Sequence, residues 1–302
     1  MGGFDAARRS ALMQDLLGLL TGRETELLPF DAVREGFWLK HLVDRGVQEV
    51  ALDGIVGTIG REHEFNRAFL PREESLRERW EKARELAEGQ EGFAPVELYQ
   101  VGEAYFVVDG HHRVSVARAM GQRAIEARVK EYLTAVPLPA SATSEDVLLR
   151  RFQADFLEAT GLVAASGDEF RLSDVSGYER MLEHINVHRY YRGVETSREI
   201  GWGEAVASWR DDIFRPMVET IRTSGIIAEF PGRTEADLYL FTMDHLHHLR
   251  QRYAPKAVQP AVAVRHFRLF YRPASRLRER LRAWWMRRRA RGGAGLREGP
   301  PG

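Results

Sequence analysis

Two kinds of hydrophobic spacing alternate along the first half of the chain. Apolar positions recur every three or four residues in some segments, as in a helix with one buried face, and every second residue in others, as in a strand. These segments form an α+β unit in which a mixed sheet is flanked by helices. Read in order, the pattern predicts helices over 5–20 and 31–43, a strand over 49–52, a helix over 71–88, strands over 96–99 and 104–108, a helix from Asp109-Gly110 to Gly121, and a strand over 124–132.

A proline-containing break over 137–141 predicts a linker to a second unit, mainly helical with a small sheet. Its predicted elements are helices over 144–160, 203–223 and 235–253, a short helix after Ser173, and strands over 169–172 and 185–191. The expected domains are N-terminal helices over 1–46, an α+β domain over 47–136, a mainly helical domain over 142–260, and a basic, partly disordered tail over 261–302.

Composition narrows the function classes. The chain has 302 residues, of which 44% are hydrophobic and 29% charged, enough for two domains with buried cores. It contains no cysteine, which excludes disulfides, cysteine-ligated zinc and thiol catalysis. No secretory leader pattern is recognised, and no run approaches the ~20 apolar residues needed to cross a bilayer. We therefore expect a cytoplasmic protein without a transmembrane segment.

The net charge of zero conceals an asymmetry. From Arg265 onward there are twelve arginines against two glutamates, whereas residues 1–264 carry 32 basic and 42 acidic side chains. Within this tail, 276–291 has leucines and the pair Trp284-Trp285 at helix-like spacing among arginines. We predict a helix there, whose partner is nucleic acid, an anionic membrane surface or the acidic body of the chain itself. A solvated tail is the alternative.

The stretch 104–120 carries most of the chemistry, because a predicted strand there turns at glycine directly into a helix. Such a turn aims unpaired backbone N–H groups and the positive end of the helix dipole at one place, which favours an anion. Arg113 offers a forked donor for phosphate, and Asp109 is either an N-cap or a magnesium ligand. The same turn is also common as a simple helix cap. The motif is Asp109-Gly110-His111-His112-Arg113.

This motif and the hairpin before it resemble the ParB/sulfiredoxin superfamily, whose members place a G-x-x-R phosphate motif after a hairpin. The resemblance covers roughly 47–132. It implies a mixed-sheet domain that binds the phosphates of a nucleotide, CTP or ATP with Mg²⁺, through the five motif residues. Sulfiredoxins have a nucleophilic cysteine where this chain has His111, so sulfiredoxin chemistry is excluded. The free serine kinases of the superfamily have a motif similar to Asp-Gly-x-His-Arg.

A glycine-rich segment, 54–67, precedes the motif and faces it if the chain follows the topology that the resemblance implies. Thr58 and Arg61 are candidates for phosphate contacts. By resemblance to the serine kinases, Glu62 or Glu64 is a candidate base for a hydroxyl, while Mg²⁺ and the helix start stabilise the transferring phosphoryl group. An exposed loop without such a role has the same alternation of charges.

His112 is the third candidate for a catalytic role. Beside a phosphate, its imidazole donates a hydrogen bond or carries a proton near neutral pH. The alternative is a histidine on the helix surface.

A second turn into a helix lies at 230–239, FPGRTEADLY. Thr234 is the predicted N-cap, and capping alone explains the acidic residues that follow it. The segment is similar to a domain of unassigned activity associated with ParB-like domains in bacteria, in which a tryptophan-containing helix precedes it, here Trp202 and Trp209. The similarity makes Arg233 a candidate for reaching the anion site from the second domain.

Histidines on the predicted helix over 235–253 invite a metal hypothesis. Asp244 shares a helix face with His247 or His248, but zinc requires three or four ligands and the sequence offers no third. Magnesium brought by a nucleotide needs only one or two protein carboxylates, and Asp109 is the candidate.

Three functions remain. The leading one is a nucleotide-binding ParB-like protein, acting as a nucleotide-controlled switch or a slow nucleotidase. The second is a phosphotransferase acting on a small hydroxyl substrate. The third is a DNA-associated partition or regulatory protein that uses the basic tail, although no helix-turn-helix with a basic recognition helix is recognised. The oligomeric state is not encoded in any motif.

Overall fold

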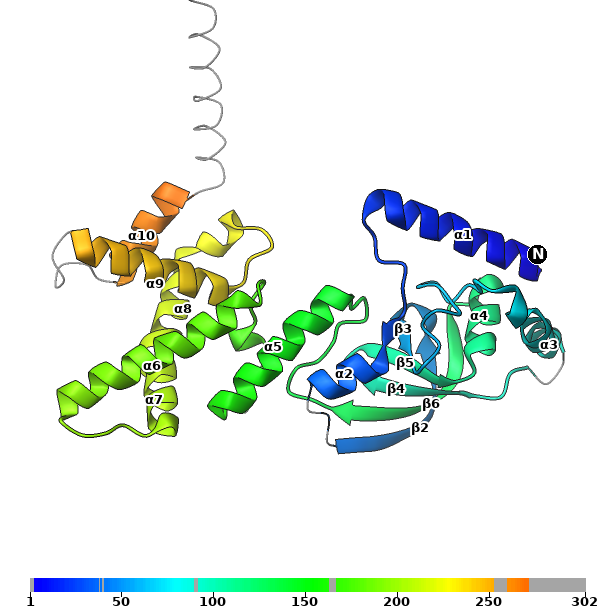
Figure 1. Cartoon of the computed structure of the whole chain (residues 1–302), viewed down its shortest axis with the longest axis horizontal. Coiled ribbons are helices and arrows are strands. Elements are labelled where there is room, and N and C mark those ends of the chain that lie inside the picture. Colours follow the sequence, from blue (N-terminus) through cyan, green and yellow to red (C-terminus); the bar gives the residue numbers. More distant parts are fainter. Residues whose placement is uncertain are drawn as a thin grey trace, which may run out of the picture. The chain divides into compact units, whose positions relative to one another are not determined.

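The computed structural model describes residues 3–37, 39, 41–89, 92–162, 167–252 and 260–271. The chain divides into two compact units, Met1–Asp168 and Glu169–Gly302 (Figure 1). All strands of the described residues lie in the first unit, so the fold combines α and β structure as the sequence predicts. No helix in the described ranges has the length and apolar character needed to cross a membrane.

The first unit is built on a six-stranded mixed sheet with the strand order β1-β3-β5-β4-β6-β2. β4 is antiparallel to β5, and β6 is antiparallel to β2. The pairs β1–β3, β3–β5 and β4–β6 are parallel. The strands are β1 (Leu28–Pro29), β2 (His41–Ala51), β3 (Ile55–Thr58), β4 (Val96–Val101), β5 (Ala104–Asp109) and β6 (Ala124–Leu133).

Local signals account for the centre of this sheet. Gly102, with φ of +65°, turns the chain between Val101 and Ala104, which pair across the hairpin. The predicted hairpin and the predicted strand over 124–132 are both confirmed.

Strand β2 departs from the prediction. The helix expected over 31–43 ends at Gly36, and the chain then enters β2, which pairs along β6 at the edge of the sheet. The second half of the expected helix is therefore wrong. Most β2 residues are exposed, so the segment has no apolar alternation from which a strand could be recognised.

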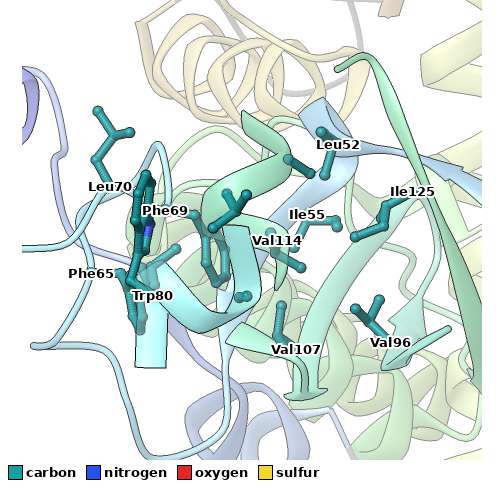
Figure 2. Packing of buried hydrophobic residues seen from close by; sticks show 14 of the residues in the cluster. Leu52, Ile55, Phe65, Phe69, Leu70, Trp80, Val96, Val107, Val114 and Ile125 are labelled. Carbon is teal, nitrogen blue, oxygen red and sulfur yellow. The ribbon is translucent and has the colours of Figure 1, made fainter. Parts of the chain in front are cut away.

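Two hydrophobic clusters cover the two faces of the sheet. Phe106 and Val107 are neighbours on β5 and point to opposite faces, so each belongs to a different cluster. Trp80 and Val114 bring α3 and α4 onto the Val107 side, as Figure 2 shows. On the Phe106 side, Phe30 belongs to α2. The helices of this unit are α1 (Phe4–Thr21), α2 (Phe30–Gly36), α3 (Arg77–Glu88), α4 (His111–Ala119) and α5 (Ser144–Thr160), with 3₁₀ turns at Leu52–Gly54 and Glu74–Leu76.

Helix α5 belongs to the first unit. It begins with a capping box in which Thr143 Oγ1 accepts a hydrogen bond from the Asp146 amide, and it packs on α2. Leu138 and Ala142, within and just after the segment predicted as a linker, are buried in the Phe106 cluster. The division of the structure after Asp168 therefore lies one helix later than the expected domain boundary at 137–141.

The second unit is helical throughout its described residues. The strands expected over 169–172 and 185–191 are wrong, because 185–191 lies inside α6 and Phe170 ends a 3₁₀ turn. Val187, Tyr190 and Tyr191 have the side chains that strands favour, but all three are exposed on α6. The elements are the 3₁₀ turn Gly167–Phe170, α6 (Ser176–Thr196), α7 (Trp202–Trp209), a π-helical turn Arg210–Phe214, α8 (Arg215–Ser224), a 3₁₀ turn Ile226–Glu229, α9 (Glu235–Arg252) and α10 (Pro260–Tyr271).

An aromatic core holds this second unit together. The Trp209 indole donates a hydrogen bond of 3.0 Å to the Tyr239 hydroxyl, which also lies 3.2 Å from His184 Nδ1. Both aromatic rings are fully buried, so the hydrogen bond satisfies polar groups that would otherwise be costly to bury. The helix predicted over 276–291 lies outside the described residues.

Candidate anion-binding site at the start of helix α4

Helix α4 begins at a glycine that no other residue can replace without strain. β5 ends at Asp109, and Gly110 turns the chain with φ of +95° before α4 starts at His111. A β-carbon on Gly110 would lie 2.5 Å from Val96 Cγ1. Both the backbone conformation and the close packing on β4 therefore require glycine here.

The start of α4 carries no side-chain cap. Its first backbone hydrogen bond runs from the Val114 amide to the Gly110 carbonyl, and no side chain bonds to the helix start. The N-cap role considered for Asp109 is therefore wrong. The amides of the first turn, together with the positive end of the helix dipole, remain available to an anion.

Arg113 is engaged by its own turn. One guanidinium nitrogen donates to the Ala94 and Pro95 carbonyls at 2.6 and 2.9 Å, and the other donates to Asp109 Oδ2 at 2.7 Å. The Arg113 side chain is 20% exposed and that of Asp109 71%. Arg113 thus ties the start of α4 to the segment that enters β4, whereas the sequence suggested a donor for phosphate. The Asp109 carboxylate is the exposed member of the pair.

His111 and Thr58, both predicted site residues, contact each other. Its Nε2 lies 2.6 Å from the hydroxyl oxygen of Thr58, which ends β3 and is fully buried. His111 is 5% exposed, and burial, helped by the charge of Arg61, lowers its pKa to about 4. The imidazole is therefore neutral at pH 7 and fixes the start of α4 against β3.

His112 presents an imidazole without a partner. Both ring nitrogens are buried, and neither has a hydrogen-bond partner among the described residues. The ring packs against the edge of Phe65, with centroids 5.5 Å apart. Burial, followed by the charges of Arg61 and Arg79, lowers the pKa of His112 to about 4. Buried polar atoms without partners are uncommon in folded proteins, so these two nitrogens mark a place that a ligand would complete.

The glycine-rich segment lies beside these histidines, as the sequence predicted. Arg61 pairs with Glu64, with nitrogen–oxygen distances of 3.1 and 3.2 Å. One carboxylate oxygen of Glu62 and one of Glu64 are buried and accept no hydrogen bond from the part of the chain that the structure describes. The segment thus brings both a cation and unsatisfied carboxylate oxygens to the first unit's candidate site.

Arg79 was missed by the sequence reasoning. It is exposed on α3, and the next residue, Trp80, donates a hydrogen bond of 2.9 Å to Ser115 Oγ on α4. That bond fixes α3 beside α4 and brings the charge of Arg79 near His112. Helix α3 is rich in charged residues, so no local signal distinguishes Arg79 from its neighbours.

No group of three or more potential metal ligands lies together in the ranges that the structure describes. The histidines considered for a metal have other contacts: His245 Nε2 lies 2.8 Å from His266 Nδ1, and His247 Nε2 lies 2.9 Å from Gln251 Nε2. Asp244 pairs with Arg180. Asp109, the carboxylate that the sequence offers for Mg²⁺, is exposed.

Arg233 belongs to the second unit, where it donates a hydrogen bond of 2.7 Å to Ser173 Oγ.

Comparison of the chain with protein-family models and with curated proteins finds no match. The features that the α4 site combines are an uncapped helix start, the charges of Arg61 and Arg79, and an imidazole whose buried nitrogens have no partner among the described residues.

Proposed function

We propose that the first unit binds the phosphates of a nucleotide, with Mg²⁺, at the start of helix α4, and that the protein acts as a nucleotide-controlled switch or a slow nucleotidase. The observation that carries the proposal is the imidazole of His112, whose buried nitrogens have no partner in the described chain. It stands in the first turn of an uncapped helix. A phosphate oxygen would satisfy both the imidazole and the helix amides.

Electrostatics supports the same ligand. Arg61 and Arg79 lie near enough to His112 for their charges to lower its pKa, so the region around this ring is positive. A bound phosphate reverses that influence, because an opposite charge favours the protonated imidazole. Binding would then take up a proton, and affinity would rise as the pH falls.

The ParB-like identity of the domain is part of the proposal. The antiparallel hairpin β4–β5, followed by Gly110 and α4, is the arrangement that the resemblance implies for a phosphate motif. In this chain the cations proposed to meet the phosphates are Arg79 and Arg61, whose charges both act on His112; Arg61 is paired with Glu64, and Arg113 donates to two carbonyls and a carboxylate.

Hydrolysis would use the neutral imidazole. With a pKa of about 4, His112 is unprotonated at pH 7 and able to accept a proton from water. The water oxygen would form a bond to the terminal phosphorus as the bridging P–O bond breaks. Mg²⁺ on Asp109 and the helix start would stabilise the charge that develops on the phosphate oxygens.

Thermal unfolding of the full chain with Mg²⁺ and CTP, ATP, GTP or UTP tests binding. At a nucleotide concentration about 100 times Kd, binding adds about 2.7 kcal/mol and raises the melting temperature by about 5–10 °C. Magnesium tripolyphosphate separates recognition of phosphate from recognition of the nucleoside. Release of inorganic phosphate from the bound nucleotide separates a nucleotidase from a switch, and we expect His112→Asn to weaken binding as well as any such release.

Matched variants locate the site. Arg61→Gln and Arg79→Gln each remove a charged donor, and we expect about tenfold weaker binding from each. Arg45→Gln is the control, because Arg45 makes an ion pair with Glu131 between the edge strand β2 and its neighbour β6. The absence of a shift with every nucleotide would contradict the proposal, as would equal losses in the control and in Arg61→Gln.

A phosphotransferase is the second candidate, favoured by the carboxylates of Glu62 and Glu64, each of which has one buried oxygen without a hydrogen bond, although that of Glu64 is in the ion pair with Arg61. Either carboxylate would take the proton of an acceptor hydroxyl as the phosphoryl group moves to it. Transfer of label from ATP to a free amino acid with a hydroxyl side chain, lost in Glu62→Gln or Glu64→Gln, would show that the activity is phosphoryl transfer and not hydrolysis.

The DNA-associated role depends on the basic tail. Loss of salt-dependent DNA retention on deletion of residues 276–302 tests it.

A further inference from the structure

The second unit contains a cavity that the phosphate proposal does not use. Its volume is about 500 Å³, within the range of small-molecule sites. α9 and α10 form most of its wall, and the FPGR turn before α9 completes it. The lining residues are Phe230, Arg233, Phe241, Asp244, His245, His248, Phe267 and Tyr271.

The apolar wall of the cavity is aromatic. Phe267 stacks on Phe230, Phe241 and Tyr271, with ring centroids 5.5, 6.4 and 4.8 Å apart. His245 packs edge-on against the rings of Phe267 and Tyr271. Flat rings at these separations offer faces and edges to another flat ring, so the wall favours a planar aromatic ligand.

Arg233 gives the cavity its charge. The guanidinium carbon lies 5.7 Å from the centre of the Phe241 ring, and the only hydrogen-bond partner that the described residues give it is the neutral hydroxyl of Ser173. The carboxylate of Asp244, by contrast, is paired with Arg180. Arg233 makes no ion pair with any described residue, although its charge reaches the exposed carboxylate of Asp174 and helps to lower the pKa of that group. Its guanidinium can therefore make a forked contact with the carboxylate of a ligand.

The imidazoles add hydrogen-bonding capacity. His245 is 8% exposed, and burial, together with His266, lowers its pKa, so the ring is neutral at pH 7. His248 lies one helical turn's distance along the same cavity wall and is exposed.

We propose that this cavity is a binding site for a small planar aromatic acid. The ring of the ligand stacks among Phe241, Phe267 and Tyr271, and its carboxylate accepts hydrogen bonds from the guanidinium of Arg233. The site lies wholly in the second unit and is independent of the nucleotide proposed for the first.

Three naphthalene probes with an anionic, a neutral and a cationic substituent test the proposal on the full chain by isothermal titration calorimetry: 1-naphthoate, 1-naphthylmethanol and 1-naphthylmethylammonium. We expect 1-naphthoate to bind about tenfold more tightly than the alcohol, because a charged contact adds about that factor, and the ammonium to bind most weakly. Equal affinities, tightest binding of the ammonium, or no binding of any probe would overturn the proposal.

Variants separate the contribution of the Arg233 charge from that of the aromatic wall. Arg233→Gln should abolish the preference for 1-naphthoate over the alcohol, while Arg233→Lys should keep part of it. Phe241→Leu should weaken all three probes alike. Loss of the preference in Arg233→Gln without any change in the melting temperature excludes unfolding as its cause, and an unchanged preference in this variant would overturn the assignment of Arg233.

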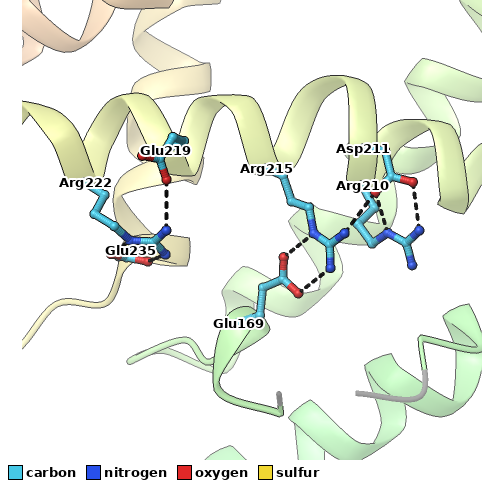
Figure 3. Close-up of polar contacts among 7 residues, drawn as sticks. All are labelled: Glu169, Arg210, Asp211, Arg215, Glu219, Arg222 and Glu235. Atoms are coloured by element: carbon cyan, nitrogen blue, oxygen red, sulfur yellow. Dashed lines mark hydrogen bonds and ion pairs between the residues drawn. The ribbon is translucent and has the colours of Figure 1, made fainter. Parts of the chain in front are cut away.

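The chain offers a control for the loss of one positive charge. Arg222 lies at the end of α8, outside the cavity lining, and pairs with Glu219 and Glu235 (Figure 3). Arg222→Gln should leave all three affinities within twofold of the wild-type values. A loss of 1-naphthoate preference in this variant equal to that in Arg233→Gln would show that the preference reflects overall charge and would overturn the site.

Discussion

Each of the two units contains a turn that leads into a helix, and the two helix starts are capped differently. At the start of α9, the Thr234 amide donates to Asp237 Oδ2 at 2.7 Å, and the Asp237 amide donates to Thr234 Oγ1 at 3.1 Å. At the start of α4, Gly110 stands where a capping side chain would be. The helix dipole is common to both, but only one start leaves its first amides without side-chain partners.

The sequence suggested both turn arginines for the anion site, and the structure uses them differently. Arg113, beside the uncapped helix start, holds its own turn together. Arg233, beside the capped start, makes no ion pair with a described residue and lines a cavity in the second unit. The residue type thus indicates the chemistry available, while the backbone carbonyls and carboxylates that surround it decide whether that chemistry is free for a ligand.

The largest expected effect on the free energy of unfolding comes from replacing the glycine of each turn with alanine. Gly110→Ala adds a β-carbon 2.5 Å from Val96 in a left-handed conformation, so we expect a loss of about 2–4 kcal/mol in the free energy of unfolding. Gly232→Ala, with φ of +79° and open space around it, should cost only about 1 kcal/mol. Urea denaturation of both variants measures the two values, and equal losses would show that packing on β4 does not distinguish the turns.

A smaller effect comes from pH. The folded-state pKa of His111 lies below its ordinary value of 6.5, at about 4, so the unfolded chain binds more protons between these values and stability falls as the pH falls through them. Between pH 7 and pH 5 this should remove on the order of 1–2 kcal/mol. His111→Asn should reduce the pH dependence of urea denaturation by that amount.

A matched substitution checks this pH effect. His41→Asn changes an exposed histidine at the start of β2 and should leave the pH dependence as it is in the wild type. If His111→Asn retained the full loss between pH 7 and pH 5, the neutral, buried state of this imidazole would be contradicted.

The smallest effects concern the caps themselves. Thr234→Ala removes the side chain that caps α9 and should cost about 1 kcal/mol. Asp109→Ala removes a carboxylate that does not cap α4 and forms only an exposed ion pair, so we expect a loss of a few tenths of a kcal/mol. Thermal denaturation measures both, and a larger loss for Asp109→Ala than for Thr234→Ala would reverse the comparison.

Local signals predicted the part of the fold around the α4 site. A glycine between two apolar alternating segments determines the β4–β5 hairpin, and Gly110 before a helix-forming run determines the start of α4. The start of α5 was predicted for the same reason, with Thr143 or Ser144 as its cap, and the structure shows that Thr143 is the cap. Each of these features depends on neighbours in sequence.

Features that depend on distant neighbours could not be predicted in this way. β2 is a strand because its backbone pairs with β6, and α6 is a helix although its exposed Tyr190 and Tyr191 favour strands. The partners of Arg113 and the position of Arg79 beside His112 likewise arise from packing between elements. The sequence identified the residue types of the site but not which arginines would be free.

The packing of α5 has a practical consequence for expressing the first unit alone. A polypeptide cut at residue 136 would lack Leu138, Ala142 and Val147, three members of the cluster around Phe106. It would also leave the guanidinium of Arg67 without the Ala142 carbonyl to which it donates. Such a fragment should be recovered mainly as insoluble material, whereas one that continues to Asp168 retains every residue that closes this side of the sheet.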